Sequence, residues 1–221
     1  MVRGVILDMD GVIMDSMPSH FESWAEAFRQ NNITVSKLDI YKREGEQGQI
    51  TAKEILEKNH QSSSPENIRK LLSAKEKIFK GLSPADFFPH AENCVTRFFQ
   101  KGLLLGLVTG TSRPEVEKLL PKTFRKYFHV IVTGTDVSFG KPHPEPYQKA
   151  VKALDLPARE ILVIENAPYG IRSAKQAGLS CIALTTSLPG RYLVEADWIK
   201  DTLPEAESLI HDLQKRPPRP A

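Results

Sequence analysis

The sequence predicts an α/β protein in which a parallel sheet is covered by helices and a helical segment is inserted near the N-terminus. Short, mostly apolar runs alternate along the chain with segments of helical periodicity, and this order is typical of repeated β-α units. Because such units connect parallel strands, the apolar runs should lie side by side in one sheet. The predicted strands are Val2–Leu7, Leu103–Val108, Val130–Thr133, Glu160–Ile164 and Cys181–Leu184.

Helical patterns follow most of these strands. After the first strand, Pro18 precedes apolar residues at i, i+3, i+4 and i+7, namely Phe21, Trp24, Ala25 and Phe28. Further predicted helices cover Glu92–Gln100, Pro114–Leu120, Pro146–Leu154 and Ile171–Ala177, the last of which is closed by Gly178.

The segment from Ile33 to Leu82 has a different character, because it is rich in charge and lacks strand-like runs. Helical patterns occur around Thr51–Lys58 and Asn67–Lys80, and Ser64-Pro65 reads as an N-cap with proline at the first helical position. We therefore expect an α/β core domain from residues 1–16 and 83–215, a helical cap domain at 17–82, and a flexible proline-rich tail at 216–221.

Composition excludes several classes of protein. The chain has 221 residues, of which 26% are charged and 40% hydrophobic, so it can build a core and is not wholly disordered. A net charge of +3 without a long basic run gives no reason to expect nucleic acid or a membrane as partner. Two cysteines cannot form a disulfide framework, and we expect Cys94 and Cys181 to be reduced and buried. With no signal peptide or apolar run of membrane-spanning length, the expected location is cytoplasmic.

Polar residues follow the predicted strands, where parallel sheets gather their functional groups. They are Asp8 and Asp10 in DMDGV, Thr109 in VTGTS, Lys141 in GKPHPEPY, and Glu165 and Asn166 in VIENAPYG. Each residue alone has a structural explanation, such as turn capping or strand termination. Their joint occurrence at successive strand ends favours a shared site.

The chemistry of this set is coherent. Gly11 allows the chain to turn and to bring Asp8 and Asp10 together. Oxygen ligands without histidine or cysteine suit Mg²⁺ rather than Zn²⁺. A hydroxyl and a lysine ammonium would hold a phosphate, so the parts needed for phosphoryl transfer through an aspartyl-phosphate are present.

The joint pattern DxDGV…T…KPxPxxY…ExxxxG resembles the haloacid dehalogenase superfamily of aspartate-nucleophile phosphohydrolases, and most closely its β-phosphoglucomutase-like branch. The resemblance covers residues 1–215 and implies a Rossmann-like core with a cap inserted after the first motif, Mg²⁺ as cofactor, a small phosphorylated metabolite as substrate, and a monomer. The expected hinges of such a cap are Asp15–Pro18 and Gly81–Pro84, both rich in turn residues.

The resemblance also implies roles for individual residues. Asp8 would be the nucleophile and Asp10 the general acid and base. The phosphoryl group would be held by Asp8, Thr109 and Lys141 and by the backbone N–H groups of Met9, Asp10 and Gly110. Mg²⁺ would be held by Asp8, the backbone carbonyl of Asp10, Glu165 and Asn166. The family usually has a second acid where this chain has Asn166. The amide implies either weaker Mg²⁺ binding, with Glu165 as the main charged ligand, or a protein that has lost turnover.

The cap segment should decide the substrate. Expected substrate contacts are His20, Trp24, Lys75, Ser112 and Arg113. Mutases of the branch hold a second phosphate with an arginine in the cap loop, where our alignment places Gly48, with Arg43 nearby but out of register. The expected function is a Mg²⁺-dependent phosphatase of a small phosphomonoester, such as a sugar phosphate. A β-phosphoglucomutase-type phosphomutase and a silent phosphate-ligand-binding protein remain as alternatives.

Overall fold

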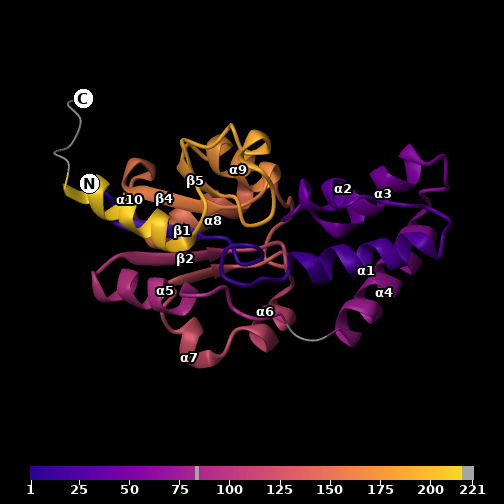
Figure 1. Ribbon diagram of the computed structural model, residues 1–221, viewed down its shortest axis with the longest axis horizontal. Helices are drawn as coiled ribbons and strands as arrows, with labels where there is room; N and C mark the ends of the chain where they lie inside the picture. Colours follow the sequence, from indigo (N-terminus) through magenta and orange to yellow (C-terminus); the bar gives the residue numbers. More distant parts are fainter. Residues whose placement is uncertain (83–84, 216–221) are drawn as a thin grey trace.

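A six-stranded, fully parallel sheet forms the centre of the protein (Figure 1). The computed structural model describes residues 1–82 and 85–215. The strand order is β3-β2-β1-β4-β5-β6, with helices on both faces, so the α/β fold class predicted from the sequence is confirmed. The strands are β1 (Gly4–Leu7), β2 (Leu104–Val108), β3 (Val130–Val132), β4 (Ile161–Glu165), β5 (Ser180–Leu184) and β6 (Trp198–Lys200).

Strand β1 lies at the middle of the sheet. All four of its residues are buried, as expected for a strand covered on both faces. Leu7 is in register with Leu107 of β2 on one side and with Ile164 of β4 on the other. The segments that follow β1, β2 and β4 therefore start next to one another at the carboxyl edge of the sheet.

Each face of the sheet has its own apolar cluster. One cluster joins the sheet to α8 (Glu145–Leu154) and α9 (Pro168–Gln176). The other joins it to α5 (Ala91–Gln100) and α10 (Leu203–Lys215), and it continues into the short helices α6 (Arg113–Leu119) and α7 (Lys122–Arg125).

The two cysteines are divided between the two clusters, and both are free and buried, as predicted. Burial raises the pKa of the Cys94 thiol to about 12, so this thiol stays protonated at neutral pH.

Four helices precede α5 and lie together at one end of the sheet (Figure 1). They are α1 (Met17–Arg29), α2 (Lys37–Tyr41), α3 (Gly48–Lys58) and α4 (Pro65–Gly81). Helix α1 packs against α4 and α2, and α3 packs against α4. The side chain of Ser64 accepts a hydrogen bond from the backbone N–H of Asn67, which is the N-cap predicted for α4.

Some elements were not predicted. Strand β6 is three residues long and lies at the sheet edge, with Ile199 exposed, so it lacks the long apolar run of the other strands. Helices α2 and α7 have only five and four residues. Helix α10 buries Leu203, Ala206 and Ile210, an i, i+3, i+7 pattern that the sequence analysis overlooked.

Two of the expected segments fall partly or wholly outside the described residues. They are the second expected hinge, of which Ser83 and Pro84 are not described, and the expected flexible tail at 216–221. Of the helices in the described ranges, none combines the length and apolar character that crossing a bilayer requires.

Candidate active site

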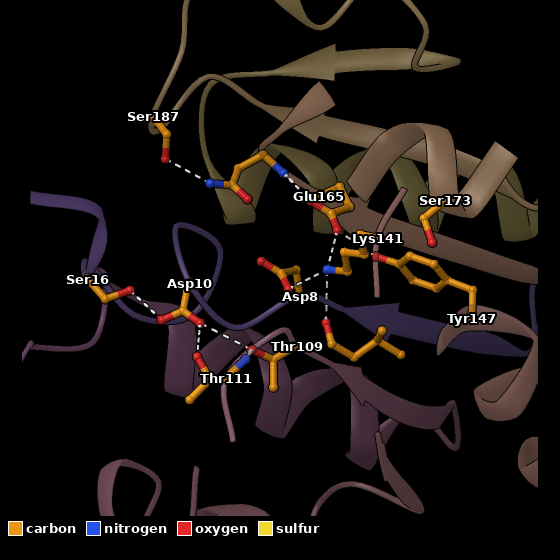
Figure 2. A network of polar contacts seen from close by, with 12 residues as sticks. Asp8, Asp10, Ser16, Thr109, Thr111, Lys141, Tyr147, Glu165, Ser173 and Ser187 are labelled. Carbon is orange, nitrogen blue, oxygen red and sulfur yellow. Dashed lines mark hydrogen bonds and ion pairs between the residues drawn. The ribbon is translucent and has the colours of Figure 1, made fainter. Parts of the chain in front are cut away.

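The loop after β1 brings two aspartates to the carboxyl edge of the sheet (Figure 2). The backbone N–H of Asp8 donates to the carbonyl of Ile164, which continues the β1–β4 ladder by one residue. Gly11 follows with a φ of +85°, so the chain turns there as predicted. Both carboxylates are almost fully buried, Asp8 at 2% and Asp10 at 1% exposure, and such groups need hydrogen-bonding or charged partners.

The ammonium of Lys141 lies at the centre of the site (Figure 2). Its Nζ donates to Asp8 Oδ1 at 2.7 Å, to Glu165 Oε1 at 2.6 Å, and to the carbonyl of Val108 at 3.2 Å. Burial alone would lower the pKa of Lys141, but the charges of Asp8 and Glu165 hold it well above its usual range. The lysine is therefore a fixed positive charge with all three of its N–H donors engaged.

Burial raises the pKa of Asp8, and the negative charges of Glu165 and Asp10 act in the same direction, while Lys141 opposes them. The side chain of Asp8 is thus held between one cation and two anions. Such a carboxylate is stabilised further by any additional positive charge that binds beside it.

The carboxylate of Glu165 is held on the side of Lys141. Its Oε1 accepts from Lys141 and from the hydroxyl of Tyr147 at 2.6 Å, and its Oε2 accepts from the backbone N–H of Asn166 at 3.0 Å. This arrangement favours a positioning role for Glu165, which differs from the role of main charged metal ligand expected from the sequence.

The amide side chain of Asn166 turns away from Lys141, towards Ser187. Its Nδ2 donates to Ser187 Oγ at 2.8 Å, which leaves Oδ1 as the acceptor on the free side. Within the described residues, Oδ1 is the one buried polar side-chain atom that lacks a hydrogen-bond partner. Such an orphaned oxygen requires a partner from outside the protein. Together with the carboxylate of Asp8 it offers hard oxygen donors, so the residues present fit Mg²⁺.

The carboxylate of Asp10 accepts hydrogen bonds from four side chains. Ser16 donates to Oδ1 at 2.6 Å and His20 lies 3.4 Å from the same atom, while Thr109 and Thr111 donate to Oδ2 at 3.1 and 2.8 Å. Burial would raise the pKa of Asp10, but the hydrogen bonds from His20, Ser16 and Thr111 hold it well below its usual range. In this arrangement Asp10 is ionised.

A cavity of about 210 Å³ lies beside these residues, between the loop after β2 and the helices α1 to α4. This size is below the roughly 300–1,000 Å³ of drug-sized ligand pockets, so the cavity suits a small molecule. Its lining includes four of the five expected substrate residues, His20, Trp24, Lys75 and Ser112, and also Gly110. The ammonium of Lys75 lies 4.6 Å from the ring centre of Phe79, and the ring of His20 lies tilted by 35° against the same ring, with the ring centres 4.7 Å apart.

Arg113 is not among the residues that line this cavity, so the expected contact between Arg113 and substrate stays a prediction. Its guanidinium instead donates to Asp136 Oδ2 at 2.6 Å and to the carbonyl of Ile131 at 2.8 Å. The expected phosphate contact at Met9 is restricted to backbone atoms, because its side chain is completely buried in the core.

Arg43 lines the cavity despite being out of register with the arginine expected of a mutase. Its Nη1 lies 3.1 Å from Glu46 and 2.6 Å from Glu54, so two carboxylates neutralise it. The wall at Gly48 offers no side chain.

Several site residues were missed by the sequence analysis. Ser16 and Thr111 bind Asp10, Tyr147 binds Glu165, and Ser187 orients Asn166. Glu44, whose carboxylate faces the cavity, was also missed. Tyr147 is part of the pattern KPxPxxY and could have been found there, but no local spacing marks the other four residues.

Three comparisons place this chain among known proteins. Residues 5–184 match a family model described as haloacid dehalogenase-like hydrolase. A protein of Thermotoga maritima named phosphorylated carbohydrates phosphatase is 31% identical over 92% of this chain and 95% of its own length. The validoxylamine A 7'-phosphate phosphatase of Streptomyces hygroscopicus subsp. limoneus is 29% identical over 93% of this chain and 96% of its own.

Solved structures give a similar result. A Bacteroides vulgatus protein, solved as a candidate β-phosphoglucomutase, matches with a TM-score of 0.86 and 31% identity over 96% of this chain and 89% of its own. The CbbY protein of Rhodobacter sphaeroides, solved in complex with phosphate, matches with a TM-score of 0.74 and 26% identity over 93% of this chain and 96% of its own.

Proposed function

The chain belongs to the haloacid dehalogenase-like hydrolases, and we propose that it is a Mg²⁺-dependent phosphatase that hydrolyses a small phosphomonoester through an aspartyl-phosphate on Asp8. The observation that carries this proposal is the contact of Lys141 Nζ with Asp8 Oδ1 at 2.7 Å. This contact fixes one carboxylate oxygen and leaves the other for attack on phosphorus.

The proposed roles follow from the contacts of each residue. Lys141 offsets negative charge on Asp8 and on the transferring group, and Glu165 and Tyr147 hold the lysine in place. Thr109 and the backbone N–H of Gly110 bind phosphoryl oxygens, with the backbone of Met9 and Asp10 on the other side of the group. Asp8, the Asp10 carbonyl and Asn166 Oδ1 would hold Mg²⁺, which when bound supplies charge neutralisation for a phosphoryl group.

Asp10 is proposed to move the protons. Its protonated carboxyl would donate to the leaving oxygen, and the resulting carboxylate would take a proton from the water that attacks phosphorus and frees Asp8. The ionised Asp10 described above suits the second step. A bound phosphoryl dianion would raise the pKa of Asp10 and so favour the protonated form in the first step.

Residues 17–82 are proposed to act as a cap domain that supplies one wall of the cavity, with residues 1–16 and 83–215 as the catalytic core. The relatives named as phosphatases of phosphorylated carbohydrates and of validoxylamine A 7'-phosphate support a sugar-like phosphomonoester as substrate.

A phosphomutase is less well supported. The similarity to the Bacteroides vulgatus structure favours it, but the pairing of Arg43 with Glu46 and Glu54 leaves no free arginine in the described cavity wall for a second phosphate. Formation of glucose 6-phosphate from β-glucose 1-phosphate would reveal mutase activity.

The test is release of p-nitrophenol from p-nitrophenyl phosphate, with Mg²⁺ titrated against EDTA. We expect Mg²⁺-dependent turnover in the wild type and a loss of at least 1,000-fold, roughly, in Asp8→Asn, since the nucleophile is removed. Asp212→Asn, at an exposed acid of α10, serves as the control and should retain full activity. Unchanged turnover in Asp8→Asn would contradict the proposal, and so would a wild type that binds phosphate without turnover.

A further inference from the structure

Glu44 places a carboxylate in the wall of the cavity, close to the proton-transferring group. One of its oxygens lies within 4.8 Å of a carboxylate oxygen of Asp10 and of a ring nitrogen of His20. The side chain lines the cavity, and no side chain within the described ranges forms a hydrogen bond or ion pair with this carboxylate. The carboxylate therefore retains capacity to accept hydrogen bonds from a ligand.

The other charged groups of the wall are largely satisfied by protein partners. Arg43 is paired with Glu46 and Glu54, and Glu46 also accepts from Thr51 at 2.6 Å. Glu115 accepts from Ser112 at 2.7 Å. This leaves Glu44 and Lys75 as the two charged groups of the described wall without a side-chain hydrogen bond or ion pair, and Lys75 lies over the ring of Phe79.

The pair offers both kinds of hydrogen-bonding group beside an aromatic surface. An ionised Glu44 can only accept and a protonated Lys75 can only donate, whereas a substrate hydroxyl can do both. The rings of Trp24 and Phe79 line the same cavity and suit the apolar face of a carbon skeleton. A second anionic group on the substrate would instead meet the negative charge of Glu44, together with those of Glu46 and Glu115.

Resting on the function proposed above, we propose that Glu44 determines specificity by accepting a hydrogen bond from a hydroxyl close to the phosphoester. The enzyme then selects neutral polyhydroxylated monophosphates over monophosphates that carry a second anionic group. The leaving oxygen must come within about 3 Å of Asp10 for proton transfer. Because an oxygen of Glu44 lies within 4.8 Å of an oxygen of Asp10, the hydroxyl that Glu44 binds lies near the phosphoester.

The test compares two substrates of similar size, glycerol 3-phosphate and 3-phosphoglycerate, which differ in a hydroxymethyl and a carboxylate group. We expect the wild type to favour glycerol 3-phosphate by about tenfold or more in kcat/KM, a ratio that corresponds to one charge-assisted hydrogen bond. Glu44→Gln, which keeps an acceptor but removes the charge, should lower this ratio severalfold. Glu44→Lys should reverse it.

The matched control is Glu57→Gln on α3, an exposed carboxylate that accepts from Ser63 outside the cavity. The control should leave the ratio unchanged. Thermal unfolding of each variant confirms that the fold is intact, and Glu44→Gln alone suffices if the lysine variant does not fold.

The outcomes separate this inference from the proposed function. A wild type that hydrolyses p-nitrophenyl phosphate but prefers 3-phosphoglycerate overturns the role of Glu44, and so does a ratio that is the same in wild type and Glu44→Gln. A wild type without Mg²⁺-dependent hydrolysis of p-nitrophenyl phosphate overturns the proposed function, and the inference with it.

Discussion

The carboxylate of Glu165 fills the space that a side chain would need at Gly170. A Cβ at position 170 would lie 1.9 Å from Glu165 Oε1 and 2.3 Å from Oε2, far inside any possible contact. Helix α9 can therefore pass this close to β4 only with glycine at that point. A side chain at position 170 would therefore also affect the position of Lys141, because Glu165 accepts a hydrogen bond from this lysine.

Gly170→Ala should displace Glu165 and loosen Lys141. Helix propensity alone predicts that alanine stabilises a helix by about 1 kcal/mol relative to glycine. We expect the opposite, a lower Tm, together with a fall in kcat of about tenfold or more. Steady-state kinetics and thermal unfolding measure both effects. Gly81→Ala in α4, where a Cβ would meet no atom within 4 Å, is the control, and equal behaviour of the two variants would refute the prediction.

Asn166 and Ser187 should set the affinity for Mg²⁺. Asn166→Asp adds a negative charge to the oxygen donors, so the Kd for Mg²⁺ should fall about tenfold. Ser187→Ala removes the acceptor that orients the amide, so the Kd should rise about tenfold or more. Calorimetric titration with Mg²⁺ alone gives these values independently of turnover. Asn93→Asp, an exposed change on α5, should have no effect, and a Kd that is insensitive to position 166 would rule out this site.

Gly45 should be required for the close approach of the segment between α2 and α3 to Lys141. A Cβ at this position would lie 2.4 Å from Cδ of Lys141, whose ammonium is fixed at both sides. We expect Gly45→Ala to lower kcat/KM by about tenfold or more. Gly102→Ala is a close control. The φ of Gly102 is +76° and that of Gly45 is +80°, but a Cβ at position 102 would meet no atom within 4 Å. Strain from the left-handed backbone, about 1–2 kcal/mol, should lower the Tm of both variants, and only Gly45→Ala should lose activity.

Acid should weaken the contact between α5 and α10. Arg97 donates to Glu207 from Nε, whose single N–H lies 2.8 and 3.1 Å from the two carboxylate oxygens, and from Nη2 at 2.5 Å. These hydrogen bonds hold the pKa of Glu207 below its usual value, although partial burial opposes them. Because the pKa is lower in the folded state than in the unfolded state, the pair stabilises the protein above the unfolded pKa of about 4.3. This contribution is lost as the pH falls through the folded pKa.

The expected size is about 1 kcal/mol, since solvent around Arg97 screens the pair. The free energy of unfolding should therefore fall less steeply below about pH 5 in Glu207→Gln than in the wild type. Parallel pH profiles of the two proteins would show that the pair contributes nothing measurable. Glu92→Gln, at an exposed acid of α5, is the control for a general charge effect.

The sequence was sufficient to predict the strands that carry the site. Strands β1, β2, β4 and β5 are continuous apolar runs, and the polar residue after each of the first three marks its carboxyl end. Strand β6 could not be recognised in this way, because its three residues pair on one side only and leave Ile199 exposed.

The different contacts of neighbouring residues within the site were harder to predict. Glu165 and Asn166 are neighbours in sequence, yet one turns towards Lys141 and the other towards Ser187. That difference depends on Tyr147 and Ser187, which come from distant segments of the chain. Arg113 shows the same limitation, since its partner Asp136 lies beyond β3.

Strands β1 and β2 are neighbours in the sheet, but the chain between them runs from Asp8 to Leu103 and carries α1 to α5. The entropy of closing a flexible loop rises by only about 0.6 kcal/mol for each doubling of its length, so a change in the size of this insertion costs the sheet little. The helical segment over the cavity can therefore be lengthened, shortened or exchanged while Asp8, Lys141 and Asn166 keep their places. Under the proposed function, the part of the molecule that would recognise a substrate is thus separate from the part that would react with it, and the two can diversify independently.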